Sequence, residues 1–229
     1  MDELVFMHVP KTGGISVATA MVAALGSTEI VERSVNRIMY LSRVRRRLLF
    51  TIIGHECRVP GAVSLQQHLA STPHSHYVVT IVRDPLDRLL SAFCHLNRGG
   101  LNSLDLADAH SLVLPYRGDF RAFVKERFRP ERCEHTCQQV HFRRQRDWLH
   151  SSAGSLLVDY IGRYETFSRD VSRLVALVGG QMRTCPILNH TDHQYYTSEY
   201  DRESREIAIR AYQSDCDMLG YRTGRDLEV

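Results

Sequence analysis

Short apolar segments alternate along the chain with segments of helical hydrophobic spacing. Residues 4–9, 50–53 and 77–82 are runs of apolar and β-branched side chains, which is the pattern of buried strands. Residues 16–25 and 86–95 carry apolar side chains at the three- and four-residue intervals of an amphipathic helix. Strands that alternate with helices predict an α/β fold with a central, mainly parallel sheet flanked by helices.

The second half of the chain continues this alternation. The sequence predicts a fourth strand at residues 156–161 and a helix over about residues 168–178. A last helix is expected over about residues 201–215, ending near Gly220. Because no repeat, low-complexity tract or linker interrupts the pattern, we expect a single domain that spans residues 1–229.

Composition and charge exclude several classes of protein. The 229 residues are 43% hydrophobic and 24% charged, which excludes a disordered or collagen-like chain. The net charge of +3 is too small for a committed nucleic-acid binder, so no nucleic-acid partner is expected. No run reaches the roughly 18 apolar residues that span a bilayer, and the first residues lack the pattern of a secretory signal. We therefore expect a cytoplasmic protein with no membrane partner and with free thiols.

Residues 10–16, with the sequence PKTGGIS, form a candidate anion-binding turn between the first strand and the first helix. Adjacent glycines let backbone amides approach an anion, the helix adds its positive N-terminal end, and Lys11 adds a full charge. The alternative is a plain tight turn with a capping serine. The Gly-Lys-Ser/Thr ending of nucleotide-hydrolase loops occurs nowhere in the chain, which disfavours a magnesium-dependent kinase.

A second candidate anion-binding segment covers residues 80–93. Arg83 follows the end of an expected strand, where the ligands of open α/β sheets bind. Ser91 lies about two helical turns further on, so that its hydroxyl can face the same side. An arginine fork and a hydroxyl together make a phosphate clamp. The alternative is a surface helix on which neighbouring arginines and aspartates form ordinary ion pairs.

Together, the two segments resemble sulfotransferases that use 3′-phosphoadenosine 5′-phosphosulfate (PAPS). HVPKTGGIS is similar to their 5′-phosphosulfate loop, and IVRDPLDRLLSAF is similar to their 3′-phosphate element. The closer likeness is to the carbohydrate branch, which includes the heparan sulfate 2-O- and 6-O-sulfotransferases. Further stretches that support it are Gly54-His55, residues 141–145, residues 160–165 and residues 212–221. The resemblance implies a P-loop-like three-layer fold that binds PAPS without a metal and releases 3′-phosphoadenosine 5′-phosphate (PAP).

The resemblance also implies roles for individual residues. Lys11 would contact the phosphosulfate and offset charge on the leaving phosphate oxygen, and Arg83 with Ser91 would hold the 3′-phosphate. The whole donor-binding set is Lys11, Thr12, Gly13, Gly14, Ile15, Ser16, Arg83, Ser91 and Thr191. The reaction is then an in-line displacement at sulfur by a hydroxyl, less readily an amine, of a small metabolite or saccharide.

A general base must take the proton of the acceptor, and His55 is the candidate. It follows Gly54 at the end of the second expected strand, at the edge where Lys11 and Arg83 should emerge. An imidazole, with an ordinary pKa of about 6.5, suits this role at neutral pH. Glu56 is the alternative base, and His8, inside the first strand, is expected to be a core histidine.

Other readings of the sequence stay open at this stage. Cys133, Cys137 and His141 can be written as a zinc site, but their spacing fits no standard pair, so no metal is expected. The arginine run at residues 43–47 is expected to be a solvated helix face, and residues 99–132 to form acceptor-contacting loops. The alternatives to a sulfotransferase are a small-molecule kinase and a non-catalytic nucleotide- or RNA-binding module.

Overall fold

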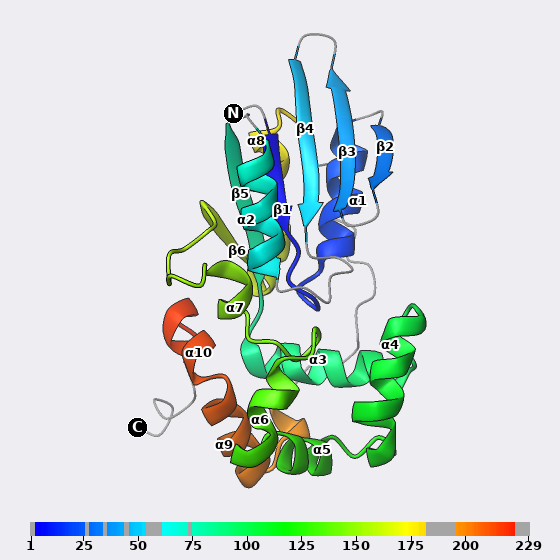
Figure 1. Ribbon diagram of the computed structural model, residues 1–229, viewed down its shortest axis with the longest axis vertical. Coiled ribbons are helices and arrows are strands. Elements are labelled where there is room, and N and C mark those ends of the chain that lie inside the picture. Colours follow the sequence, from blue (N-terminus) through cyan, green and yellow to red (C-terminus); the bar gives the residue numbers. More distant parts are fainter. Residues whose placement is uncertain are drawn as a thin grey trace. The chain divides into compact units, whose positions relative to one another are not determined.

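The computed structural model describes residues 3–25, 28–33, 36–43, 46–53, 61–72, 75–181 and 196–222 (Figure 1). The chain divides into two compact units. The first comprises Met1–Arg83 with Asp147–His190, and the second comprises Asp84–Arg146 with Thr191–Val229. Each unit has its own apolar core. The single domain over residues 1–229 stays a prediction.

A six-stranded sheet forms the centre of the first unit. Its parallel strands, in spatial order, are β4 (Arg46–Ile53), β1 (Glu3–Met7), β5 (His76–Val82) and β6 (Tyr160–Arg163). Two antiparallel strands extend the sheet beyond β4, namely β3 (Asn36–Arg43) and β2 (Thr28–Arg33). The prediction of a mainly parallel sheet in an α/β fold is confirmed.

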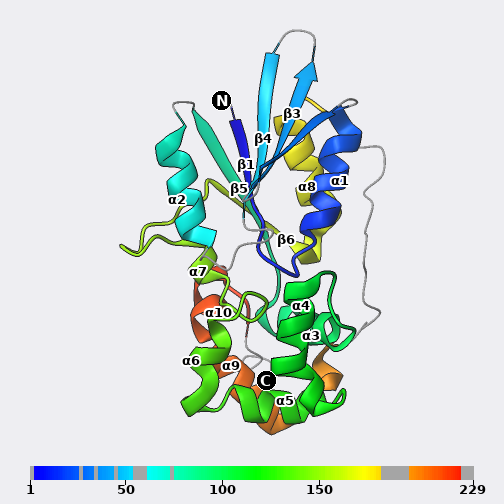
Figure 2. The same ribbon diagram turned by 45° about the vertical axis from the view of Figure 1, so that its right-hand side comes forward.

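Helices cover both faces of this sheet. Helices α1 (Gly14–Leu25) and α8 (Phe167–Leu177) lie on one face, and α2 (Gly61–Ser71) lies on the other (Figure 2). Apolar side chains of β1 and β5 pack against α1 and α8, among them Leu4, Phe6, Val79, Ile81, Val17, Met21 and Leu174. The first unit also contains the short helical segment η3 (Tyr164–Thr166) and all of α7 (Arg146–Leu149) except Arg146.

Two expectations about this part of the chain were wrong. The arginine run at residues 43–47 is not a helix face, because Arg43 ends β3 and Arg46 begins β4. Pairing between neighbouring strands decided the structure there, although the sequence lacks a clean strand pattern. The strand expected at residues 156–161 begins later, at Tyr160.

The second unit is helical in its described residues. Its elements are α3 (Pro85–Asn97), α4 (Ser103–Asp108), η1 (Ala109–Val113), η2 (Leu114–Tyr116), α5 (Phe120–Arg127), α6 (Pro130–Cys137), η4 (Tyr196–Glu199), α9 (Arg202–Ala211) and α10 (Gln213–Leu219). The expected loops at residues 99–132 are therefore helical over much of their length. The expected last helix is two helices, α9 and α10, which are separated at Tyr212. The buried Tyr212 hydroxyl donates to the Phe142 carbonyl at 2.7 Å.

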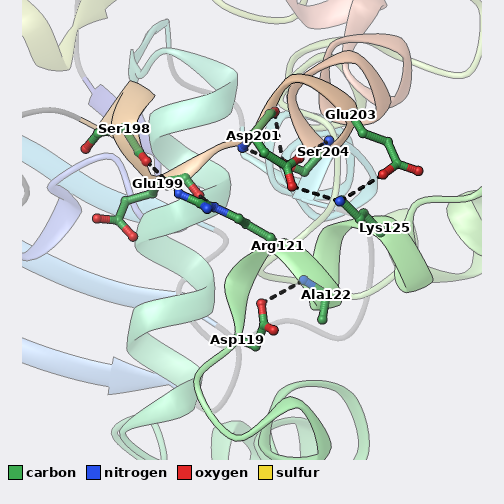
Figure 3. Close-up of polar contacts among 9 residues, drawn as sticks. All are labelled: Asp119, Arg121, Ala122, Lys125, Ser198, Glu199, Asp201, Glu203 and Ser204. Carbon is green, nitrogen blue, oxygen red and sulfur yellow. Dashed lines mark hydrogen bonds and ion pairs between the residues drawn. The ribbon is translucent and has the colours of Figure 1, made fainter.

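A polar network joins α5 to the start of α9 (Figure 3). The Arg121 guanidinium donates to the carbonyls of Ser198 and Glu199, at 3.0 Å each. The Lys125 ammonium contacts Asp201 at 2.7 Å and Glu203 at 2.8 Å. These contacts fix the segment that leads into α9. None of the helices in the described ranges is long and apolar enough to cross a membrane.

Asp215 provides a test of the second unit. Its carboxylate is fully buried and accepts hydrogen bonds from the backbone N–H of Gln145 at 2.7 Å and of Arg146 at 2.9 Å. Because Asp215→Asn weakens charge-assisted bonds to buried donors, we expect it to lower the free energy of unfolding by about 1–3 kcal/mol in urea denaturation. The exposed neighbour Asp217 is the matched control, since Asp217→Asn should change it by less than about 0.5 kcal/mol. Equal effects of the two substitutions would contradict this role.

Candidate functional site

The turn between β1 and α1 is a tight loop with an unusual backbone. Lys11 has a φ of 70° and Gly13 a φ of 87°, both in the left-handed region. For a residue with a side chain, this conformation costs about 1–2 kcal/mol, and it persists mainly where function requires it. The loop is closed by the buried Thr12, whose hydroxyl donates to the Val9 carbonyl at 2.8 Å. The Thr12 hydroxyl proton is therefore used in a hydrogen bond within the loop.

Aromatic rings pack against both sides of the loop and explain why positions 13 and 14 are glycines. A Cβ atom on Gly14 would lie 1.9 Å from Cδ2 of His8, and one on Gly13 would lie 2.7 Å from Cε2 of Phe167. The His8 ring is buried, as predicted, and stacks on the ring of Phe6 with centroids 6.1 Å apart. The backbone of the loop is thus held between aromatic side chains, where it has no room for a larger residue.

Arg83 brings a second cation to the same loop. It directly follows β5, and its Nη1 donates to the Lys11 carbonyl at 3.3 Å. Its guanidinium lies 4.2 Å from the centre of the Tyr164 ring, a cation–π contact, and only 6% of Arg83 is exposed. The prediction that Lys11 and Arg83 emerge at the same edge of the sheet is confirmed. Together with the N-terminus of α1, they form a positive site suited to an anion.

Asp170 holds the segment that carries Tyr164 and Phe167. Its buried carboxylate accepts hydrogen bonds from the Arg163 N–H at 2.8 Å, the Thr166 hydroxyl at 2.7 Å and the Arg169 guanidinium at 2.9 Å. Burial alone would raise the pKa of this carboxyl, but the three donors outweigh burial and lower the pKa to about 2. The carboxylate therefore stays ionised and fixes the start of α8 beside the loop.

Helix α3, which follows Arg83 in the chain, begins at a well-capped N-terminus. Asp84 accepts hydrogen bonds from the backbone N–H of Leu86 at 2.9 Å and of Asp87 at 3.2 Å, and Pro85 occupies the first turn. Asp84 also accepts from the Tyr196 hydroxyl at 3.0 Å. Burial raises the pKa of the Asp84 carboxyl.

The alternative interpretation of this segment as an ordinary surface helix does not hold, because most residues of α3 are buried. Arg88, only 1% exposed, donates to the Arg143 carbonyl at 2.9 Å.

The site residues predicted from the sequence do not all lie in the same unit, and some lie outside the described residues. Lys11, the loop residues up to Ser16 and Arg83 come together in the first unit. Ser91 is buried in α3 of the second unit. His55, its alternative Glu56 and Thr191 lie outside the described residues.

Sequence reasoning missed the residues that surround the loop. Tyr164 belongs to the stretch at residues 160–165 that carries part of the resemblance, but its spacing gives no sign of a contact with Arg83. Asp170 gives no sequence signal either, because its role depends on the turn between β6 and α8. For these residues, only the fold shows the contact.

The zinc reading of Cys133, Cys137 and His141 does not match the contacts of these residues. His141 Nε2 lies 3.0 Å from Oδ1 of Asp105. Among the described residues, the groups with metal-ligand geometry contain neither cysteine.

Comparison with known proteins gives the family of this chain. The family model of the sulfotransferase family matches residues 1–222, which include residues of both units. The chain therefore belongs to the sulfotransferase family, whose members are enzymes that transfer sulfuryl groups. The searches of curated proteins and of solved structures gave no match.

The contact between His8 and Gly14 can be tested by a double-mutant cycle. Gly14→Ala should lower the free energy of unfolding by about 1–3 kcal/mol, because the new methyl group overlaps the His8 ring. In a His8→Ala background the same substitution should cost less, with a coupling energy of about 0.5–3 kcal/mol. Urea denaturation of the four proteins gives this coupling. An equal cost of Gly14→Ala in both backgrounds would rule out the steric explanation.

Asp170 should make stability depend on pH in the acid range. An aspartate in the unfolded chain has a pKa of about 3.9, whereas the folded value is about 2. Because the folded state binds this proton less tightly, the stabilisation is fully present above about pH 4 and is lost as the pH falls towards 2. Denaturation of Asp170→Asn between pH 7 and pH 2 should show a flatter profile than the wild type. Ser172→Ala, at an exposed position of the same helix, is the control that should keep the wild-type slope, because it removes no titratable group.

Proposed function

We propose that this protein transfers a sulfuryl group from PAPS to a hydroxyl, less readily an amine, of a small metabolite or saccharide. The observation that carries the proposal is the approach of Arg83 to the Lys11 carbonyl at 3.3 Å, at the N-terminus of α1. The Arg83 guanidinium, the backbone of Lys11 and a helix N-terminus come together there, around a loop with close-packed glycines. This combination suits a phosphosulfate group better than a neutral ligand.

The proposed chemistry is an in-line displacement at sulfur. The acceptor oxygen forms a bond to sulfur while the bond between sulfur and the bridging phosphate oxygen breaks. The Lys11 ammonium offsets the charge that develops on that leaving oxygen. Backbone amides from Thr12 to Ser16 bind the 5′-phosphate, and the fixed loop supplies the positioning on which such a reaction depends.

The remaining roles in the proposal come from the resemblance to PAPS-dependent sulfotransferases. His55 takes the proton of the acceptor hydroxyl, while Arg83, Ser91 and Thr191 contribute to binding of the donor. Lys11 and Arg83 supply the positive charge that a metal ion would otherwise bring, so we propose metal-independent donor binding. The carbohydrate branch, with its heparan sulfate enzymes, is the proposed subtype, and the cytoplasmic location stays a prediction.

Calorimetric titration with PAP tests the donor site. We expect the wild type to bind PAP equally well with and without magnesium. Lys11→Ala and Arg83→Ala should each weaken binding at least tenfold, or about 1.4 kcal/mol, because each removes a charge from the phosphate site. The PAP affinity of Arg83→Lys should lie between those of the wild type and Arg83→Ala. Lysine keeps the positive charge but lacks the guanidinium fork that contacts the loop.

The controls separate the proposal from its alternatives. Arg173→Ala removes an exposed arginine from the same unit and should leave PAP affinity within about twofold. His55→Ala should also leave PAP affinity unchanged, because the base acts on the acceptor. Magnesium-dependent binding of ATP without binding of PAP would instead support a kinase. Binding of polynucleotides with a steep salt dependence, and no PAP binding, would support a nucleic-acid-binding module.

A further inference from the structure

A buried carboxylate and two histidines meet at the end of the sheet opposite to the Lys11 loop. Glu3 begins β1 and His76 begins β5, and the two residues are direct partners in the parallel register. His68 lies in the last turn of α2. Because Lys11 follows the other end of β1, this cluster and the loop are separated by the length of the strand. All three residues belong to the first unit.

The three side chains already have the spacing of metal ligands. Oε1 of Glu3 lies 2.9 Å from Nε2 of His68, and Oε2 of Glu3 lies 3.2 Å from Nε2 of His76. The ligand atoms of the three residues all lie within 4.8 Å of one another. In a tetrahedral zinc site with bonds of about 2.0–2.1 Å, neighbouring ligand atoms are roughly 3.3 Å apart. Small side-chain shifts would therefore admit a cation.

The buried Glu3 carboxylate makes a positive charge beside it favourable. The Glu3 side chain is 0% exposed, and the His68 and His76 side chains are 7% and 13% exposed. A carboxylate removed from water is costly unless positive charge or strong donors face it. Two strands and a helix hold the ligands, and such elements position a site more rigidly than loops do.

A hydroxyl group and a cleft lie beside the cluster. The Thr72 hydroxyl donates to the His68 carbonyl at 2.8 Å, and its oxygen lies 2.7 Å from Nε2 of His76. This contact is to the same nitrogen that a cation would take, so the Thr72 hydroxyl would give it up on binding and keep its hydrogen bond to the His68 carbonyl. A cleft of about 330 Å³ lies against His76, with Val78 and residues 156–159 among its walls. This cleft gives a cation a path of entry and room for an exchangeable ligand.

We propose that Glu3, His68 and His76 bind a divalent transition-metal ion, with Zn²⁺ as the first candidate. Two histidines and one glutamate are a zinc ligand set that leaves a fourth position for water or another small ligand, and the cleft beside His76 offers room for it. On binding, each Nε2 exchanges its contact with Glu3 for the cation. An Nε2 proton moves to Nδ1, or to solvent if the ring was charged. The site is independent of the donor site.

A similar cluster in the second unit serves as the matched control. Oδ1 of Asp105 lies 3.0 Å from His141 Nε2, and Oδ2 lies 3.0 Å from His95 Nε2 and also accepts from the Leu101 N–H at 2.9 Å. Burial alone would raise the pKa of the Asp105 carboxyl, but these donors hold it well below its usual range. A carboxylate already served by three donors gains less from a cation, so we expect no metal there.

Equilibrium dialysis of the untagged chain tests the proposal. The chain is stripped with a chelator and dialysed against Zn²⁺, and bound metal is measured by elemental analysis. We expect one equivalent in the wild type and at least a tenfold weaker affinity in His68→Gln, His76→Gln and Glu3→Gln. His95→Gln and Cys133→Ser should bind as the wild type does. Loss of binding in either control variant, or no stoichiometric binding in the wild type, would overturn the proposal.

X-ray absorption of the zinc-loaded wild type covers the case in which a variant fails to fold. Two imidazole ligands with the remainder oxygen are expected, because the cluster offers two Nε2 atoms and a carboxylate. A sulfur ligand would place the metal at cysteines and overturn the assignment. A change in PAP affinity on zinc loading would also contradict the claim that the two sites are independent.

Discussion

The loop between β1 and α1 depends on the packing of rings against its glycine backbone. His8 occupies the space beside Gly14, while Phe167 and Tyr164 occupy the space beside Gly13. Neither side can move without disturbing the core, because His8 stacks on Phe6 and Phe167 belongs to the cluster under α8. The position of Lys11, and the carbonyl to which Arg83 donates, follow from this packing. The positive site is thus a consequence of how the sheet is covered.

The two ends of the same strands carry opposite chemistry. At the C-terminal ends, Lys11 and Arg83 add positive charge to the helix N-terminus, which suits an anion. At the N-terminal ends, the buried Glu3 faces two histidines, which suits a cation. In a parallel sheet every strand presents the same end to one edge, so such sets of like chemistry arise from strands that are distant in sequence.

Local structure could be predicted from the sequence better than contacts between residues that are distant in the chain. The strands at residues 4–9 and 77–82 and the glycine turn between β1 and α1 were predicted because apolar runs and glycines carry a local signal. β2 and β3 were missed, since their pairing with β4 rather than their own pattern makes them strands. The cluster of Glu3 with His68 joins residues 65 apart in the chain, and no spacing rule connects them. The cation–π contact between Tyr164 and Arg83 was not predicted for the same reason.

The backbone at Lys11 is the strongest local argument that the loop binds a ligand. A glycine would adopt a φ of 70° without the cost that a lysine bears there. Gly13 and Gly14 lie two and three residues further on, at positions where a side chain would overlap neighbouring rings. A lysine at a position that favours glycine is consistent with the role that we propose for its ammonium. Under the proposed function, that role is to offer charge to the departing phosphate oxygen.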